Sequence, residues 1–227
     1  MRITVIGASG RIGGCIMREA LRRGHAVTAV VRDGFRGDHG ESALPVVRAD
    51  VFDPVAVAAV LADCDVLVSA VGHAASLDDQ GYYERAARSL VQALRGCGTG
   101  APRLLVVGGF GSLRGETGTQ LADAGGYPDH AVPEIVGQRD ALTYYRTVTD
   151  VRWTYISPPP GGIGPGPRTG GYRTARDGLP GRPGGLRVST EDFAVAVLDE
   201  AERAEHLFAC LTVASTSISG RMGRGGH

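Results

Sequence analysis

Three glycines near the start of the chain have a spacing suited to holding a phosphate group. Gly7, Gly10 and Gly13 follow a short apolar run and precede an amphipathic one. The first permits a tight exit from a strand, the second lets backbone approach a pyrophosphate, and the third lets a helix pack closely on the sheet. The other motif members considered for binding are Ser9, Arg11 and Ile12. Helix N-termini favour anions, so residues 7–13 predict dinucleotide binding; the alternative is a glycine-rich turn without a ligand.

The end of the second predicted strand decides which dinucleotide fits. A carboxylate there binds the ribose hydroxyl of NAD(H), whereas an arginine accommodates the 2′-phosphate of NADP(H). This chain has Arg32 followed by Asp33, and Arg11 offers a second phosphate partner. We therefore expect NADP(H) to be preferred. NAD(H) remains possible if Arg32 is a solvated strand end and Asp33 binds the ribose.

Residues at the ends of later strands extend the predicted coenzyme site. Asp50 and Val51 follow the third strand, where they could meet the adenine edge, although Asp50 is equally suited to capping the next turn. Ala70, Val71 and Gly72 end the fourth strand, where small residues let the backbone lie close to a ribose.

Hydride transfer to a ketone requires a proton donor for the developing alkoxide. The 24 residues counted as Lys or Arg are all arginine, which excludes a Tyr-x-x-x-Lys pair, Schiff-base chemistry and a lysine phosphate loop. Flavins, quinones and other conjugated acceptors delocalise charge and need at most one weak donor. The missing lysine therefore favours acceptors of that kind.

Three side chains are candidates for such a donor or for orienting an acceptor. Ser112 follows the fifth predicted strand, although a serine in a turn often bonds its own backbone. Tyr155 could act as an acid, although a tyrosine in a strand is more often part of the core or its rim. His73 follows the fourth strand and is the best placed of the six histidines, although loop histidines are usually solvated.

Apolar strands alternate with amphipathic helices from residue 2 to about residue 157. We expect strands at 2–6, 26–31, 46–49, 65–71, 103–107, 152–157 and 206–213, and helices at 11–23, 54–62, 80–96, 134–149 and 190–204. This alternation predicts an α/β protein with a doubly wound, mostly parallel sheet, the Rossmann fold. Residues 1–213 form one predicted domain. Its Pro- and Gly-rich residues 158–190 are expected to be an irregular substrate cap, and residues 214–227 a flexible tail.

Composition narrows the classes of function. The 227 residues include 24 acidic and 24 basic ones and have zero formal net charge, so nucleic acid is not an expected partner. Four scattered cysteines indicate neither a disulfide framework nor a metal site, and predict a reducing cytoplasm. We expect no signal peptide and no membrane span. A small-molecule substrate is the expected partner, and a homodimer is compatible with the sequence.

Several segments resemble the atypical short-chain dehydrogenase/reductase group. These NAD(P)H-binding or NmrA-like proteins include NADH-flavin reductases and relatives of biliverdin reductase B. The resemblance covers nearly the whole chain to residue 213 and rests on the glycine turn and on Arg32, Asp50, Ala70–Gly72, Gly108–Leu113, Trp153–Pro158, Arg168–Arg173 and Ser189–Ala194. It implies a coenzyme on a Rossmann sheet, with Gly108 among its contacts.

The resemblance also implies where a substrate lies. Phe110, Ser157, Arg168 and Tyr172 are the substrate-side candidates. Phe110 departs from the subgroup, which usually has a small residue there. Arg168 and Tyr172 are expected in a lid that holds substrate or phosphate, with a structural ion pair as the equal alternative.

These observations predict an NADPH-dependent reductase that transfers hydride to a small conjugated, quinone-like, flavin or carbonyl acceptor. Two alternatives remain open. One is a non-redox, NADP-binding regulatory module of the NmrA type. The other is a biosynthetic ketoreductase, epimerase or cyclase that uses bound coenzyme.

Overall fold

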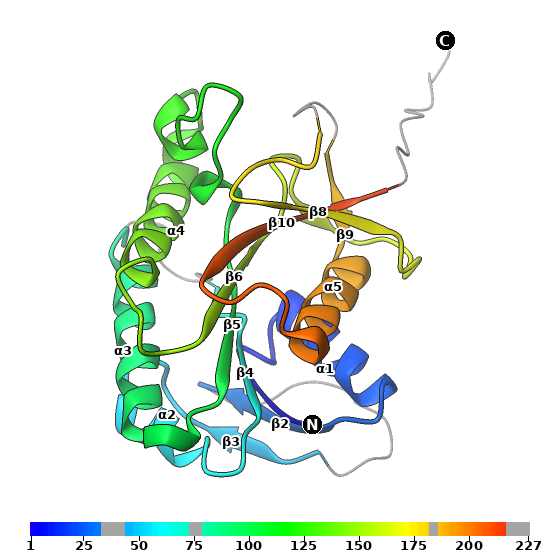
Figure 1. Cartoon of the computed structure of the whole chain (residues 1–227). Helices are drawn as coiled ribbons and strands as arrows, with labels where there is room; N and C mark the ends of the chain where they lie inside the picture. The colour runs from blue at the N-terminus through cyan, green and yellow to red at the C-terminus, as the bar shows by residue number, and fades with distance from the viewer. Residues whose placement is uncertain (33–43, 73–78, 182–185, 217–227) are drawn as a thin grey trace.

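One eight-stranded sheet forms the centre of the molecule (Figure 1). The computed structural model describes residues 1–32, 44–72, 79–181 and 186–216. The strands lie in the order β3-β2-β1-β4-β5-β6-β10-β8, and the pair β10–β8 is antiparallel while the other pairs are parallel. The strands are β1 (Arg2–Ile6), β2 (Ala26–Val31), β3 (Val46–Arg48), β4 (Val66–Ser69), β5 (Arg103–Val107), β6 (Trp153–Ser157), β8 (Tyr172–Arg176) and β10 (Ala209–Ser215). The predicted doubly wound, mostly parallel sheet is confirmed.

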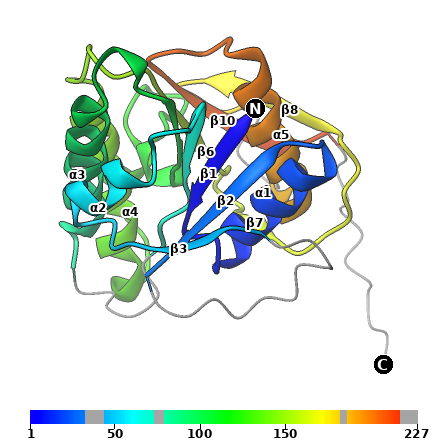
Figure 2. The same ribbon diagram turned by 90° about the horizontal axis from the view of Figure 1, so that it is seen from below.

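Helices cover both faces of this sheet (Figure 2). Helices α1 (Arg11–Arg22) and α5 (Thr190–Arg203) pack together on one face. The other face carries α2 (Pro54–Ala59), α3 (Tyr82–Gly96) and α4 (Val132–Tyr145). Because both faces are covered, the inner strands β1, β4, β5 and β6 are buried along almost their whole length, as their continuous apolar sequences require.

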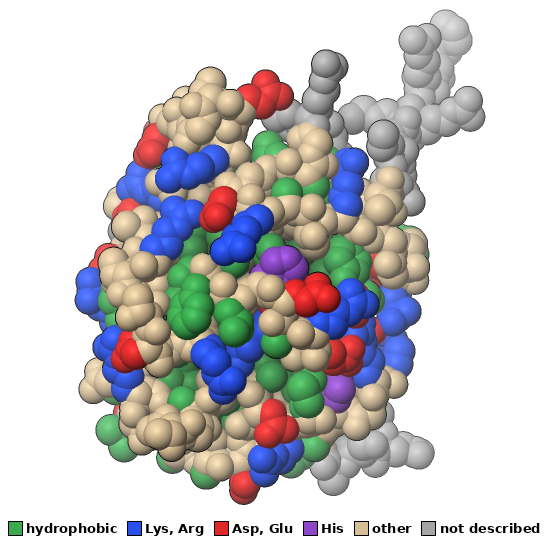
Figure 3. All heavy atoms as spheres, in the orientation of Figure 1, with side chains coloured by type: hydrophobic (Ala, Val, Ile, Leu, Met, Phe, Trp, Pro, Cys, Tyr) green, Lys and Arg blue, Asp and Glu red, His purple; other side chains and the backbone are tan. Residues whose placement is uncertain are grey.

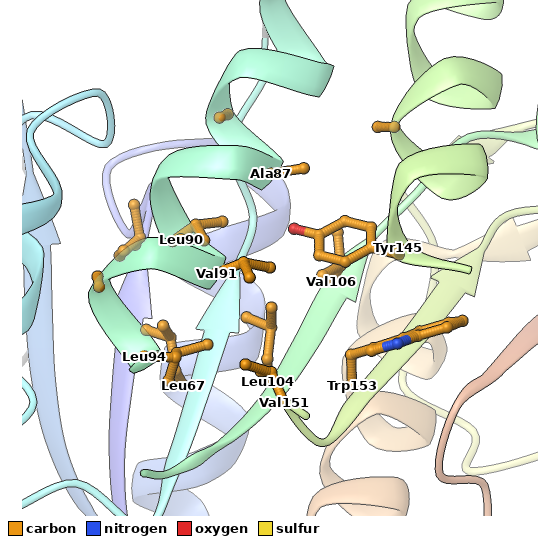
Figure 4. Close-up of a cluster of buried hydrophobic side chains, with 14 of the residues drawn as sticks. Leu67, Ala87, Leu90, Val91, Leu94, Leu104, Val106, Tyr145, Val151 and Trp153 are labelled. Carbon is orange, nitrogen blue, oxygen red and sulfur yellow. The ribbon is translucent and has the colours of Figure 1, made fainter. Parts of the chain in front are cut away.

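The core on the α3 and α4 side is built from side chains of both helices and of three neighbouring strands (Figure 4). Leu90 and Val91 of α3 are at most 1 % exposed. They lie over Leu67 and Leu104, while Tyr145 of α4 stacks at a tilt on Trp153, with ring centroids 5.8 Å apart. This packing holds the ends of β4, β5 and β6 at one edge of the sheet.

The order of the strands reverses between β1 and β4. The chain leaves β1 for α1 on one face, and leaves β4 for α3 on the other face. In open α/β sheets, ligands bind outside the carboxyl ends of the strands where the order reverses in this way. The carboxyl edge at β1 and β4 is therefore where a ligand site is expected.

The expectation of an irregular segment over residues 158–190 is wrong in part. Strand β8 extends the sheet, and β7 (Ile163–Gly164) pairs with β9 (Val188–Ser189) in a separate two-stranded sheet. The run 172–176 contains no Pro or Gly, so it can donate and accept the ladder hydrogen bonds with β10. Strand β10 also continues to Ser215, into the predicted tail, and α4 begins at Val132, two residues early. Within the described ranges, no helix is long and apolar enough to cross a membrane.

Candidate functional site

The turn after β1 brings backbone so close together that two of its positions have no room for a side chain. Gly7 has a φ of 81°, and a Cβ there would lie 2.5 Å from the carbonyl oxygen of Ala70. A Cβ at Gly13 would lie 2.2 Å from the carbonyl oxygen of Gly7. The amide of Gly10 donates to that same carbonyl at 2.9 Å. The first turn of α1 is therefore seated directly on the end of β1, with the end of β4 alongside.

The N-terminus of α1 is open at this edge. Its N-cap residue is Gly10, which has no side chain to cap the helix, and Ser9, Gly10 and Arg11 are exposed. The first amides of a helix have no intrahelical partners and carry the positive end of its dipole. The turn is thus a cradle for an anion. The Arg11 guanidinium contacts the carbonyl oxygen of Ile163 at 3.4 Å, which joins the cradle to β7.

The predicted adenosine end lies beside the ends of β2 and β3. Arg32 is exposed directly after β2. The Asp50 carboxylate accepts from the amide of Phe52 at 3.0 Å, which is the capping role left open above. The Val51 side chain is buried in the core, so only its backbone is available to a ligand. Asp33 and His73 lie outside the described residues.

The end of β4 completes the cradle. Ala70 and Val71 are half-buried and Gly72 is exposed. The hydroxyl of Tyr82, at the start of α3, donates to the Gly72 carbonyl at 3.4 Å. Sequence reasoning gave Tyr82 no role; the signal available was an aromatic side chain at the predicted start of a helix that follows this strand.

The residues that follow β5 lie next to the end of β4 and border the same edge of the sheet. Gly108 is buried, and a Cβ there would lie 1.9 Å from the Tyr155 ring. The half-buried Phe110 follows, with its ring 5.6 Å from that of Tyr127. Tyr127 belongs to the segment between β5 and α4 and was not among the predicted residues. The two rings offer an aromatic surface beside the end of β5.

Two predicted catalytic residues are corrected by their burial. Tyr155 is 0 % exposed, and its hydroxyl donates to the side-chain oxygen of Gln138 at 2.6 Å. Burial raises the pKa of Tyr155 well above the usual value. Ser112 is also 0 % exposed, and its hydroxyl donates to the carbonyl oxygen of Gly109 at 2.7 Å. Both hydroxyls donate to protein oxygens in the interior, which is the structural alternative weighed for each residue.

The substrate-side residues from β6 and the cap are corrected in the same way. Ser157 is 0 % exposed in the interior of the sheet. Arg168 forms two hydrogen bonds of 2.8 Å with Glu19 of α1. The Tyr172 hydroxyl donates to Asp199, and burial, followed by that contact, raises its pKa. Arg168 and Tyr172 therefore form structural contacts, as in the alternative stated above. Of the four substrate-side candidates, only Phe110 lies beside the site.

The contacts of Arg168 belong to an anchored strap, which we define as residues 168–172. The amides of Thr169 and Gly170 each donate to the Asp192 carboxylate at 2.7 Å. Hydrogen bonds from Arg168 lower the pKa of Glu19 to about 2, because their effect exceeds that of burial, which raises this pKa. Residues of the predicted cap are thus tied to α1 and α5.

Two cavities lie outside the glycine turn. A cavity of about 20 Å³, large enough for one water molecule, lies under the carboxyl edge and is bordered by Tyr155 and Gln138. A larger one of about 290 Å³ lies between α5 and the strands β8 and β10, with Tyr172 and His206 in its wall. On the face in Figure 3, charged side chains of both signs are intermixed.

A glycine cradle at the reversal point of a doubly wound sheet defines the dinucleotide-binding class of Rossmann proteins. The model of the family described as NAD(P)H-binding matches residues 7–203, and the chain belongs to that family. It is also 34% identical over 218 residues to the uncharacterized protein YwnB of Bacillus subtilis (strain 168), covering 95% of this chain and 99% of that one.

Solved structures of similar proteins cover nearly the whole chain. The chain is 38% identical to a "putative exported protein" from Burkholderia pseudomallei, with a TM-score of 0.82 and coverage of 94% and 99% of the two chains. It is 31% identical to a "putative NADH-flavin reductase" from Streptococcus pneumoniae TIGR4, with a TM-score of 0.81 and coverage of 95% and 99%. A "putative epimerase" from Bacteroides thetaiotaomicron is 30% identical, with a TM-score of 0.81 and coverage of 95% and 97%.

Proposed function

We propose that this protein is an NADPH-dependent reductase of a flat, conjugated acceptor such as a quinone, a flavin or an extended carbonyl compound. The observation that carries the proposal is the glycine cradle, in which Gly7 and Gly13 leave no space for a Cβ. Such closeness brings backbone amides, rather than side chains, to the ligand. Gly7, Ser9, Gly10, Arg11, Ile12 and Gly13 would hold the pyrophosphate.

The remaining coenzyme contacts are assigned along the same edge. Arg32 would bind the 2′-phosphate, with Asp50 and the backbone of Val51 near the adenine. The backbone of Ala70, Val71, Gly72 and Gly108 would approach the ribose and nicotinamide. When bound, NADPH supplies a hydride, and the acceptor takes up a proton from solvent to complete a two-electron reduction.

The aromatic pair Phe110–Tyr127 supports a flat acceptor. The rings lie next to the end of β5, where we expect the nicotinamide, and they favour a planar conjugated ring. Ser112 and Tyr155 point their hydroxyls into the protein, and the chain has no lysine to pair with a tyrosine. An acceptor that delocalises charge needs no proton relay at the site, so it suits these residues better than a simple ketone.

The test is NADPH oxidation by the purified protein with a panel of flavins, quinones and enones. We expect turnover with at least one of them and little effect of replacing Ser112 or Tyr155. NADPH binding without oxidation by any acceptor would favour the non-redox module instead. The name of the Bacteroides relative favours a second candidate, an epimerase; solvent deuterium entering a substrate without net NADPH consumption would support it.

A cytoplasmic location is part of the proposal. The scattered cysteines support it, since they are spaced as in proteins of a reducing compartment. The description of the Burkholderia relative as exported gives the competing possibility, and fractionation of cells that produce the protein would decide between them.

A further inference from the structure

We infer that Arg48 is a second determinant of coenzyme specificity, acting together with Arg32 on the 2′-phosphate of NADP(H). This inference rests on the proposed function, because it concerns the same coenzyme. Arg48 ends β3, the strand at one edge of the sheet, and the sequence motifs assign it no role.

The position of Arg48 is set by two backbone relationships. It lies opposite Val31 in the parallel pairing of β2 with β3, so it stands beside the end of β2. Its Nε atom also donates to the carbonyl oxygen of Arg32 at 3.0 Å. This hydrogen bond holds the exposed guanidinium of Arg48 against the residue that is expected to read the phosphate.

Arg32 directly follows β2 and Arg48 ends β3, so the two side chains leave neighbouring strand ends. Burial raises the pKa of Tyr82, while the nearby charge of Arg32 lowers it and that of Asp50 raises it. Arg32 follows β2, Asp50 follows β3, and Tyr82 begins α3, where its hydroxyl donates to the carbonyl oxygen of Gly72 after β4. Two guanidinium groups from adjacent strand ends can bind a phosphate through several charge-assisted hydrogen bonds.

Two aromatic residues at the same edge of the sheet favour a phosphate that is attached to a base. Phe52 is 38 % exposed, and its ring meets that of Tyr82 edge-on with centroids 5.1 Å apart. The guanidinium of Arg85 lies 5.5 Å from the Phe52 ring centre. Flat rings bind a purine base by stacking, so aromatic rings at the edge that carries Arg32 and Arg48 suit a phosphorylated adenosine better than a free inorganic anion.

The experiment compares the dissociation constants of NADPH and NADH for the full chain and for R48A, R32A and F52A. We expect R48A to weaken NADPH binding roughly tenfold or more and NADH binding less than twofold, since a charged hydrogen bond to phosphate is lost. F52A is the matched control: it should weaken both coenzymes equally, because both carry the adenine. R48A should likewise weaken the binding of the fragment 2′,5′-ADP, which carries the 2′-phosphate, and leave the binding of 5′-AMP nearly unchanged.

A second variant and a stability measurement distinguish the loss of a coenzyme contact from a folding defect. R48K keeps the positive charge and should retain most of the NADPH preference, and thermal unfolding checks that all variants are folded. Unchanged NADPH binding in R48A, or equal losses for the two coenzymes, would overturn the inference while leaving the proposed function intact. Failure of the unmodified chain to bind either coenzyme would overturn both.

Discussion

The α carbon of Gly13 faces the carbonyl group of Gly7 so closely that a methyl group at Gly13 would come within 2.2 Å of its oxygen. Six residues apart in sequence, the two glycines set how α1 sits on β1. The same contact leaves the amides of the helix start open at the reversal point of the sheet. Stability and coenzyme binding are therefore coupled through this one pair.

Replacing Gly13 with alanine should abolish measurable coenzyme binding. The methyl group meets backbone, so α1 must shift away from β1 and the cradle opens. We expect a loss of about 1–3 kcal/mol in the free energy of unfolding, the usual cost of overpacking. Urea unfolding and calorimetric titration of the same preparation measure both effects.

Gly14 supplies the control for that substitution. A Cβ there has ordinary contact, 3.4 Å from the carbonyl oxygen of Ala8, and Gly14 lies within the helix. G14A should keep coenzyme binding and be as stable as the unmodified protein or up to about 1 kcal/mol more stable, because alanine favours helix. Equal damage from G13A and G14A would contradict the role given to the Gly7–Gly13 contact.

The hydroxyl of Tyr155 should matter for stability and not for coenzyme binding. Y155F leaves the buried oxygen of the Gln138 side chain without its donor, which should cost about 1–3 kcal/mol. The dissociation constant for NADPH, and any turnover, should change less than twofold. A large fall in turnover at unchanged stability would restore Tyr155 as a catalytic acid.

Replacing Arg168 should loosen the strap of residues 168–172. Glu19 is 2 % exposed, so R168A leaves a buried carboxylate with fewer donors. We expect a lower urea midpoint of unfolding than in the unmodified protein, because the buried partner Glu19 loses both hydrogen bonds from Arg168. The amides of Thr169 and Gly170 should exchange hydrogen faster.

Arg95 provides the comparison for this ion pair. It binds Asp150 where both side chains are more than half exposed, so R95A should cost well under 1 kcal/mol. If R95A and R168A are equally destabilising, the strap contact is an ordinary surface pair.

The low pKa of Glu19 predicts a dependence of stability on acid. Its folded-state pKa of about 2 lies below the ordinary 4.5, so ionised Glu19 stabilises the fold fully above about pH 5. That stabilisation, up to about 3 kcal/mol, is lost as the pH falls from there toward 2. Urea midpoints of the unmodified protein and E19Q should therefore converge on acidification, and a constant difference from pH 7 to pH 3 would contradict the assignment.

Local pattern was enough to predict the fold and the glycine turn after the first strand. The continuous apolar runs identify buried parallel strands. Gly7 and Gly10 lie between the first strand and the first helix, and Gly13 lies in the first turn of that helix, in the structure as in the prediction. Their spacing encodes a contact between residues close in sequence, which is why sequence reasoning can find it.

Tyr155, Ser157, Arg168 and Tyr172 have structural contacts that the sequence could not predict, because these contacts involve distant parts of the chain. Tyr155 and Ser157 are polar residues of a strand whose neighbours, β5 and β10, bury it on both sides. Arg168 meets Glu19, 149 positions away. The burial of a side chain and its contact with a residue far away in the sequence cannot be predicted from the local spacing of residues.

Titration calorimetry of the purified chain with NADPH and NADH tests the central claim most directly. We predict one binding site per chain, with NADPH bound more tightly than NADH and with the difference shrinking as salt screens the arginines. Absence of heat from both coenzymes at concentrations that saturate a micromolar site would contradict the assignment of the glycine cradle, and with it the proposed reductase.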